Sequence, residues 1–505
     1  MKRLSALACA VFAAASHAGV VADFGVETGR LRPELHSAGF GPQICSCPPS
    51  VVEEVKSMGF KASRTHDWAL LNPNQRVCDC HHIFPLMHLD AAEPKNYVFG
   101  PTDYLLGRTR EELGTEIFFR LGTSIEHSGT KTHFNSLIPA DFEKMAETFA
   151  GTIRHYNRGW ADGHEWGIRY WEIWNEPDGQ NNMWCLPDGD FGQGDTKEAR
   201  VADAAAREKR RLDLFVKFFV TCLKRIKDEF GDTVKVGGPA LCTWRESRPD
   251  RIGTEAYFRS LFAACREAGV APDFISWHYY GNKPGDVLAA VERARKLCDD
   301  EGFPKCELVL NEWHYKNVGW DTLRSKDPNV RQKVWSGPAS HNGIDSSCFN
   351  LTLLSRFQTS KLDQAYYYGC KNTGSWGYKS EQGDRYKVYY GLKMFGDFLR
   401  EFPVMCASES DLPGVTVISA KSADGMRCAV LVTDYRSSLR ELSAEFRGVA
   451  PDAECEVLVH DYERDMESAK ARLEGGKLAL GKRDANSAAF LVTFPAAAAE
   501  FRIDR

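Results

Sequence analysis

Two segments of the chain run from a stretch of apolar residues into an Asn-Glu pair. The first is YWEIWNEPD at residues 170–178, and the second is LVLNEWH at residues 308–314. Aromatic and β-branched residues favour strands, and a proline ends the hydrogen-bond ladder of a strand, so Glu176 and Glu312 are expected at the carboxyl ends of two strands. Two carboxyls, one a general acid and the other a nucleophile, are the groups that a retaining glycosidase needs about 5 Å apart. The sequence therefore predicts that Glu176 and Glu312 are catalytic.

Other side chains near predicted strand ends are suited to assist this pair. Asn175 can hydrogen-bond the sugar hydroxyl beside the reacting carbon. His278 and Tyr280 are two residues apart on one strand and therefore point to the same side. We expect Tyr280 to lie beside Glu312. Arg64 is expected to lower the pKa of the nucleophile, because an adjacent positive charge favours the ionised carboxylate.

Three further predictions concern neighbours of these residues. His66 and Asp67 follow Arg64 at the end of its strand, and either contacts the substrate or only anchors the loop that follows. Glu172 precedes Glu176 by four residues on the same strand, so we expect it inside the sheet structure and away from substrate. Apolar neighbours such as Trp174 would raise the pKa of the general acid.

Aromatic residues near strand ends are candidates for stacking on sugar faces. Trp376 is the best placed of them, since it lies in the loop KNTGSW after the last predicted strand. Trp313 directly follows Glu312 and is also a candidate. The other candidates are Trp68, Trp184 and Trp277.

Strand and helix patterns alternate along most of the chain. Eight strand–helix pairs within residues 19–403 predict an α/β fold, a (β/α)8 TIM barrel, in which active sites lie at the carboxyl ends of the strands. A doubly wound open sheet is the alternative, but no G-x-G-x-x-G turn follows the first predicted strand. The predicted strands are residues 20–26, 60–65, 116–121, 168–174, 234–239, 274–280, 307–310 and 365–368. The predicted helices are residues 51–58, 103–113, 140–157, 199–230, 254–268, 285–300, 340–360 and 389–400.

The pattern changes after Pro403. Short strand-like runs at residues 415–419, 426–434, 442–446, 453–460 and 488–494 predict a small all-β sandwich over residues 404–505. All 12 tryptophans lie at or before Trp376, so this domain lacks the aromatic platform of a typical sugar-binding module. We interpret it as an accessory domain that packs on the barrel.

The first 18 residues have the pattern of a signal peptide. Lys2 and Arg3 precede an alanine-rich apolar run, and Ser16-His17-Ala18 offers small residues for cleavage near Ala18. A secreted or periplasmic protein is expected, with no membrane span, because no apolar run is long enough to cross a bilayer. The net charge of −5 gives no indication of a nucleic-acid partner.

Of the 16 cysteines, Cys9 lies within the predicted signal peptide, which leaves an odd number in the mature chain. Export makes disulfides plausible. Two pairs, Cys45 with Cys47 and Cys78 with Cys80, have C-x-C spacing rather than the C-x2-C of zinc sites, so we expect disulfides or buried thiols there and no metal.

Four segments of the chain resemble glycoside hydrolase family 39, which belongs to clan A. Residues 170–178 resemble the acid/base segment of that family, and LNEW at residues 310–313 resembles its nucleophile segment. RTHD at residues 64–67 and SWHYY at residues 276–280 resemble its second and sixth strand segments. The resemblance covers roughly residues 20–400. The segments 78–82 and 180–195 look like insertions, and the segment after the eighth strand lacks the acidic residue expected near its tryptophan.

The resemblance implies a (β/α)8 barrel and a retaining mechanism, with Glu176 as acid/base and Glu312 as nucleophile. It implies an oligo- or polysaccharide substrate and no cofactor. An exo-acting β-xylosidase or related β-glycosidase is the first expectation. An arabinofuranosidase, an endo-glycanase, an α-L-iduronidase and a sugar-binding barrel without turnover are the alternatives. An iduronidase would need a cation for the sugar carboxylate, for which Lys371, Lys379 and Arg385 are available.

Overall fold

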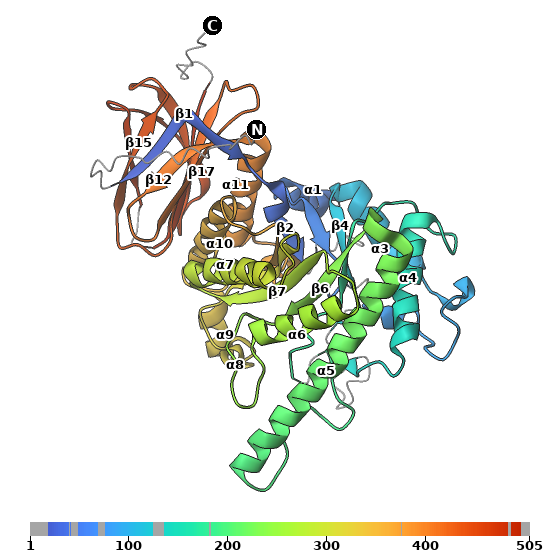
Figure 1. Ribbon diagram of the computed structural model, residues 1–505. Coiled ribbons are helices and arrows are strands. Elements are labelled where there is room, and N and C mark those ends of the chain that lie inside the picture. The colour runs from blue at the N-terminus through green and yellow to red at the C-terminus, as the bar shows by residue number, and fades with distance from the viewer. Residues whose placement is uncertain are drawn as a thin grey trace, which may run out of the picture.

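The structure is a computed structural model that describes residues 19–39, 41, 49–68, 76–124, 136–180, 183–374, 376–482 and 486–495. A closed eight-stranded barrel forms the larger part of the molecule, and a β-rich domain lies beside it (Figure 1). All neighbouring barrel strands are parallel and follow one another in chain order. The predicted TIM barrel is therefore confirmed. Its strands are β2 (Ser37–Gly39), β3 (Ala62–Arg64), β4 (Glu116–Leu121), β5 (Tyr170–Ile173), β6 (Lys235–Leu241), β7 (Phe274–Gly281), β8 (Glu307–Tyr315) and β9 (Gln364–Tyr368).

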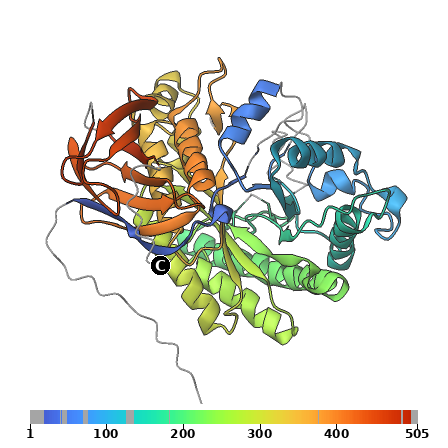
Figure 2. The same ribbon diagram turned by 90° about the horizontal axis from the view of Figure 1, so that it is seen from above.

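Helices surround this barrel, as Figure 2 shows from above. The longest of them, α5, has 34 residues, and its first half projects beyond the barrel (Figure 1). Two short helices, α8 and α9, lie in the long connection after β8, where the sequence predicted no helix. The helices are α1 (Pro49–Ser57), α2 (Cys80–Ile83), α3 (Gly100–Arg108), α4 (Phe142–Arg158), α5 (Lys197–Phe230), α6 (Thr254–Glu267), α7 (Pro284–Asp300), α8 (Trp320–Leu323), α9 (Pro328–Trp335), α10 (Ile344–Phe357) and α11 (Lys387–Glu401).

The interior of the barrel is filled in layers. An apolar cluster of Ala62, Phe118, Phe274, Val309 and Tyr366 occupies the amino-terminal half. Along each strand alternate residues point inward, so the next inward residues are two positions further on. On β3, β5 and β7 these are polar, and they form the base of the site described below. The apolar cluster thus closes the barrel from below and leaves the polar residues facing its carboxyl-terminal mouth.

The first strand, β1 (Val20–Arg30), does not belong to the barrel. It pairs with β12 (Val404–Ser410) and with β15 (Glu441–Arg447) in the sheet of the β-rich domain. The expectation that residues 20–26 form the first barrel strand is therefore wrong. That position belongs to β2, in a segment where no strand was predicted because Ser37-Ala38-Gly39 carries none of the β-branched or aromatic residues that mark strands.

The β-rich domain is built from one nine-stranded sheet. The sheet curves back on itself, because Phe446 of β15 and Phe494 of β19 are in ring contact, 5.1 Å between centroids, although four strands separate them in the sheet order. Three of its strands were not predicted: β12, β17 and β18. Besides β1, β12 and β15, the sheet contains β13 (Val415–Lys421), β14 (Cys428–Asp434), β16 (Glu454–His460), β17 (Asp465–Arg472), β18 (Lys477–Gly481) and β19 (Ala488–Phe494).

The two domains are joined mainly through α10. Asp345 accepts hydrogen bonds from Arg436 Nε at 2.8 Å and from Ser487 Oγ at 2.6 Å, both in the β-rich domain. The hydroxyl of Tyr435 donates to the carbonyl of Asn282, in the loop after β7, at 2.7 Å. These contacts join the β-rich domain to the start of α10 and to the loop after β7.

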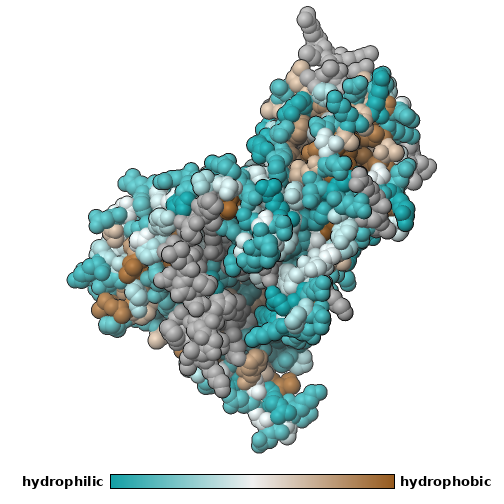
Figure 3. Space-filling model, turned by 180° about the vertical axis from the view of Figure 1, so that it is seen from behind, coloured by the Kyte–Doolittle hydropathy of each residue, from teal (hydrophilic) through white to brown (hydrophobic). Residues whose placement is uncertain are grey.

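No helix among the described residues is long and apolar enough to cross a membrane. The face of the molecule in Figure 3 is mostly hydrophilic, and its hydrophobic residues gather on the β-rich domain. The predicted signal peptide lies outside the described residues.

Candidate active site

The residues of the site are arranged around a buried carboxylate at the centre of the barrel. Glu172 of β5 is fully buried, and Ser276 Oγ and Asn311 Nδ2 each donate a hydrogen bond to its Oε1 at 2.6 Å. Arg64 Nε donates to its Oε2 at 2.8 Å. Four strands of the barrel therefore meet at Glu172. The structure agrees with the prediction that this glutamate lies inside the barrel.

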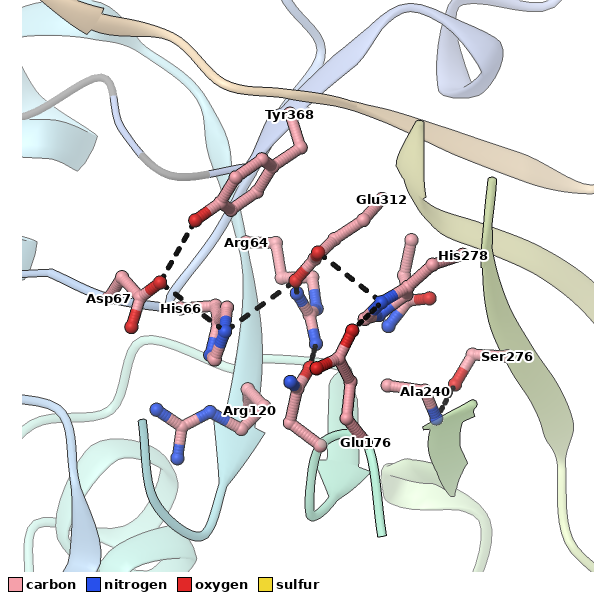
Figure 4. Close-up of polar contacts among 12 residues, drawn as sticks. Arg64, His66, Asp67, Arg120, Glu176, Ala240, Ser276, His278, Glu312 and Tyr368 are labelled. Atoms are coloured by element: carbon pink, nitrogen blue, oxygen red, sulfur yellow. Dashed lines mark hydrogen bonds and ion pairs between the residues drawn. The ribbon is translucent and has the colours of Figure 1, made fainter. Parts of the chain in front are cut away.

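Arg64 connects this buried layer to the residues above it. Its Nη1 donates to Glu312 Oε1 at 2.9 Å and its Nη2 donates to Asn175 Oδ1 at 2.6 Å. The guanidinium is completely buried, so its orientation is fixed by these partners (Figure 4). One side chain thus positions Glu312 and Asn175 together.

Glu312 points into the barrel because β8 carries a bulge. Trp277 of β7 faces Leu310, but the next residue, His278, faces Glu312, so β8 has one extra residue at this point. A bulge breaks the alternation of side chains along a strand. Asn311 and Glu312 therefore both face inward: Asn311 bonds Glu172, and Glu312 Oε2 accepts from the Tyr280 hydroxyl at 2.6 Å.

Glu176 reaches the site from a sharp change of chain direction after β5. Trp174 and Glu176 have φ angles of 72° and 45°, in the left-handed region that non-glycine residues rarely adopt. The Trp174 ring lies so close to Gly122 that a Cβ there would be 2.8 Å from it, and its Nε1 donates to the Met183 carbonyl at 2.6 Å. This packing maintains the unfavourable backbone and aims Glu176 at the barrel mouth. Strain of this kind is concentrated at functional sites.

The two glutamates converge on one histidine. His278 Nδ1 lies 2.9 Å from Glu176 Oε1 and 3.3 Å from Glu312 Oε2. One ring nitrogen of the histidine and one oxygen of each carboxyl group all lie within 4.8 Å of one another. Figure 4 shows His278 between the two carboxyl groups. Both neighbours of Nδ1 are carboxyl oxygens, so the tautomer with hydrogen on Nδ1 fits this geometry.

Burial dominates the ionisation of these groups. It raises the pKa of Glu312, although Arg64 and the Tyr280 hydroxyl oppose it. The expected lowering by Arg64 therefore exists but is outweighed, because a carboxylate removed from water loses its solvation. Burial also lowers the pKa of His278, and it lowers that of His66 well below the usual range, so burial favours the uncharged form of both imidazoles.

His66, Asp67 and Tyr368 extend the site on the β3 side. His66 Nε2 lies 3.6 Å from Glu312 Oε1 and 3.6 Å from Asp67 Oδ2. The hydroxyl of Tyr368, the last residue of β9, donates to Asp67 Oδ2 at 2.9 Å. Tyr368 was not among the predicted site residues. Its place at the carboxyl end of the eighth barrel strand is the signal that would have found it.

The aromatic candidates divide into one at the site and four in the core. Trp376 is partly exposed, and its ring lies 5.9 Å from that of Tyr280 and 5.4 Å from that of Tyr368. Trp313 is completely buried against Phe357 of α10, so its prediction as a substrate-binding residue is wrong. The bulge that turns Glu312 inward leaves Trp313 pointing outward to the helices. Trp68, Trp184 and Trp277 are also fully buried.

Trp320 at the start of α8 is an aromatic residue that the sequence analysis missed. Its side chain is 39% exposed and its ring packs edge-on against Tyr280 at 5.2 Å. Lys316 and Arg324 lie over the same ring, at 5.1 and 5.3 Å. Trp320 and Trp376 therefore both border Tyr280 at the mouth of the barrel.

Two groups of side chains have a composition that could hold a metal ion. The first is Glu176, His278 and Glu312, but both oxygens of Glu312 already accept hydrogen bonds, one from the guanidinium of Arg64. A fixed positive charge beside the ligands disfavours a cation there. The second is Asp103, His155 and His164 on the outer helices, where His155 Nε2 lies 2.9 Å from Asp103 Oδ1.

The described cysteines are all free thiols. Cys78 and Cys80 are buried, and burial raises the pKa of both. Asp79 between them bonds Arg120 and Ser124, so this segment is held by a carboxylate and not by sulfur. Cys45 and Cys47 lie outside the described residues.

Replacing Arg64 by methionine is expected to destabilise the fold strongly. The substitution leaves the buried carboxylates of Glu172 and Glu312 without their cation, and breaking a buried ion pair in this way costs about 3–5 kcal/mol. Urea unfolding followed by tryptophan fluorescence measures the effect. The double variant Arg64→Met with Glu172→Gln is the control, because it removes one orphaned charge and should recover part of the loss. An Arg64→Met chain as stable as the parent would contradict this account.

Three solved structures with the same architecture are glycosidases. A glucosidase from Croceicoccus marinus has a TM-score of 0.69 at 19% identity, over 95% of this chain and 98% of that chain. A monomeric beta-xylosidase from Caulobacter crescentus has a TM-score of 0.63 at 15% identity, over 95% and 100%. A GH51 alpha-L-arabinofuranosidase from Thermotoga petrophila has a TM-score of 0.60 at 12% identity, over 94% and 99%.

The chain has the fold of these glycosidases. The similarity extends over both the barrel and the β-rich domain, since nearly the whole length of each chain is matched. No family model matches the sequence. At these identities the likeness establishes the architecture, and the chemistry depends on the side chains at the barrel mouth.

Proposed function

We propose that the protein is a retaining glycoside hydrolase related to family 39. The proposal rests on the carboxyl groups of Glu176 and Glu312, which have oxygen atoms within 4.8 Å of each other at the mouth of the barrel. Retaining enzymes place their carboxyls about 5 Å apart, whereas inverting enzymes need roughly 6.5–9.5 Å to admit a water molecule. The separation supports direct attack by a carboxylate.

The contacts of each glutamate support a division of roles. Glu312 accepts hydrogen bonds from Arg64 and Tyr280, which favour its ionised form against the effect of burial and aim it as the nucleophile. Glu176 lies 2.9 Å from His278 Nδ1, and an uncharged imidazole places no positive charge beside the carboxyl, which suits a group that is protonated before attack. Glu176 protonates the leaving oxygen while Glu312 attacks the anomeric carbon, and Glu176 then accepts a proton from the water that releases the sugar.

The surrounding residues are assigned to substrate. Within the described part of the chain Asn175 Nδ2 makes only a 3.5 Å contact with the Met183 sulfur, so it is available to donate to a sugar hydroxyl beside the reacting carbon. His66 and Tyr280 border the same space, and Trp376 and Trp320 offer ring surfaces at its rim. We infer an exo-acting β-glycosidase, with a β-xyloside as the first substrate to test.

The N-terminal pattern adds a proposal on location. A signal peptide cleaved near Ala18 would export the enzyme to the periplasm or the medium, where an oligo- or polysaccharide is its partner. Comparing the N-terminus of the protein recovered from the secreted fraction with the encoded one tests this.

A panel of aryl glycosides tests the proposed function. The panel contains the β-xyloside, β-glucoside, β-galactoside, α-arabinofuranoside and α-iduronide, and the product anomer is followed by NMR during the first turnovers. Hydrolysis of a member with retained configuration is the expected result. Inverted product would exclude the retaining mechanism. Silence across the panel, with glycan binding intact, would indicate a sugar-binding barrel.

The Tyr280→Phe variant is expected to shift the pH profile. The Tyr280 hydroxyl lowers the pKa of Glu312, so its loss raises that pKa further above the usual carboxyl range. Because the nucleophile must be ionised, activity is lost as pH falls through this pKa, and the acidic limb of kcat/KM moves to higher pH. At neutral pH we expect a loss on the order of tenfold from the missing charge-assisted hydrogen bond.

The matched control for this prediction is Tyr279→Phe. Tyr279 is adjacent in sequence but points to the other face of β7, where its hydroxyl donates to the Lys283 carbonyl at 3.0 Å. This variant should keep the parent profile. An acidic limb of Tyr280→Phe that stays in place or moves to lower pH would refute the role given to this hydroxyl.

A further inference from the structure

A groove of about 900 Å³ lies beside the barrel mouth and is not used by the proposed reaction. Helix α9 contributes Arg331, Gln332 and Trp335 to one side, together with Lys326 two residues before the helix, and the segment after β9 forms the other side. That segment contains the short strands β10 (Lys371–Thr373) and β11 (Gly377–Lys379). Trp376 borders both the groove and the candidate active site, because it lines the groove and its ring also contacts that of Tyr280.

The groove is positively charged. Lys326, Arg331 and Lys371 line it together with one carboxylate, Glu381. All three cations are exposed, and none forms an ion pair with another described residue, in contrast to Lys379 and Arg385 nearby, which both bind Glu54. Of the three cations named from the sequence as partners for a sugar carboxylate, only Lys371 therefore remains available. An excess of positive charge here stands out in a chain whose net charge is −5.

The same groove has the aromatic lining of a carbohydrate site. Trp335, Trp376 and Tyr386 are all partly exposed along it. Beneath the two tryptophans lies His341, whose ring is 4.7 Å from Trp335 and 4.8 Å from Trp376. His341 is 1% exposed, and neither of its ring nitrogens has a hydrogen-bond partner within the described part of the chain. The wall of the groove thus contains two imidazole nitrogens that can still form hydrogen bonds, as well as ring surfaces.

We propose that this groove binds an anionic sugar residue of the glycan that is cleaved, through a carboxylate or a sulfate group. The proposal rests on the proposed function, because it treats Trp376 as the boundary between the reacting sugar and the next unit. Ring faces bind sugars without regard to charge, while lysine and arginine side chains that are not engaged by protein carboxylates select an anion. A neutral polysaccharide would leave three cations in the groove without a partner.

The test compares binding of four polymers to the purified chain carrying Glu176→Gln, which removes turnover. Alginate presents carboxylates, κ-carrageenan presents sulfates, xylan is the neutral comparison, and single-stranded DNA measures unspecific attraction to polyanions. Affinity electrophoresis gives the dissociation constants. The groove variant carries Lys326→Ala, Arg331→Ala and Lys371→Ala. The matched control carries Lys217→Ala, Lys305→Ala and Lys361→Ala, three exposed cations without ion pairs among the described residues, so both variants lose the same charge.

The expected result is that alginate or carrageenan binds more tightly than xylan and DNA. The groove variant should weaken that binding about tenfold, or about 1.4 kcal/mol, while the control variant keeps it. Which polymer binds identifies the anion. Equal binding of xylan, equal binding of DNA, or an equal loss in the control variant would each overturn the proposal. Because binding is measured without turnover, groove-dependent binding together with a silent aryl glycoside panel would keep the subsite and reject the hydrolase.

Discussion

The Glu312→Ala variant is expected to lose at least about 10⁴-fold in kcat on any glycoside that the parent hydrolyses. The reason is that Glu172, the buried carboxylate below it, cannot take its place, because it is fully buried and engaged by Arg64, Ser276 and Asn311. Removing the nucleophile of an enzyme with a covalent intermediate leaves only binding and residual electrostatic effects. Initial rates over a range of enzyme concentrations measure the loss.

A small anion distinguishes loss of the nucleophile from loss of the fold. In Glu312→Ala, azide can occupy the space of the missing carboxylate and attack the anomeric carbon from that face, which yields a glycosyl azide with inverted configuration. Glu307→Ala is the control, since Glu307 begins the same strand and pairs with Lys235 at the far end of the barrel. That variant should keep its turnover. Activity of Glu312→Ala above about 1% of the parent, or a retained azide product, would show that Glu312 is not the nucleophile.

The positions of the two glutamates could be predicted because they depend on local sequence. An apolar strand that runs into Asn-Glu-Pro must place its carboxylate at the strand end, and parallel strands present such ends at one mouth. Glu176 follows the fourth barrel strand and Glu312 lies on the seventh, as the strand count predicted. His278 and Tyr280 share a face of β7 as alternation requires. Contacts along one strand and its ends were thus readable from the chain.

Features that depend on pairing between distant segments could not be predicted. The assignment of β1 to the β-rich domain rests on its pairing with β12 and β15, nearly the whole chain away. The bulge at Asn311 is defined by the register of β8 against β7 and β9, and without it the alternation would have placed Trp313 and Glu312 differently. Trp320 lies at the site because α8 folds back over Tyr280, in a connection with no strong periodicity.

The net direction of the pKa shift of Glu312 could not be predicted either, because it also depends on how distant segments pack. The sequence indicates that an arginine is nearby, and the expected sign of its effect on the pKa is correct. It does not indicate that the carboxylate is 4% exposed, which decides the net direction. The electrostatics of the site could therefore be obtained only from the packed structure, whereas the residue types at the site could be predicted from the sequence.

Replacing Glu176 by alanine is expected to reduce turnover by an amount that depends on the leaving group. An alkyl glycoside leaves as a strongly basic oxygen that must be protonated, so its kcat/KM should fall about 10²–10⁴-fold. A dinitrophenyl glycoside leaves as a weakly basic phenolate, so its first step should be almost unchanged. Release of the sugar from Glu312 still needs a base to activate water, so a rapid burst of phenolate should precede a slow steady state.

Azide gives the decisive comparison between the two variants. In Glu176→Ala the nucleophile is present, so azide attacks the glycosyl-enzyme on the face that Glu176 vacated, and two successive inversions give a retained glycosyl azide. The same anion gives the inverted product in Glu312→Ala. If Glu176→Ala lost equal activity on both leaving groups, or gave an inverted azide, Glu176 would not be the acid/base. Opposite stereochemistry from one reagent assigns each carboxylate to its own face of the sugar, which a comparison of rates alone cannot do.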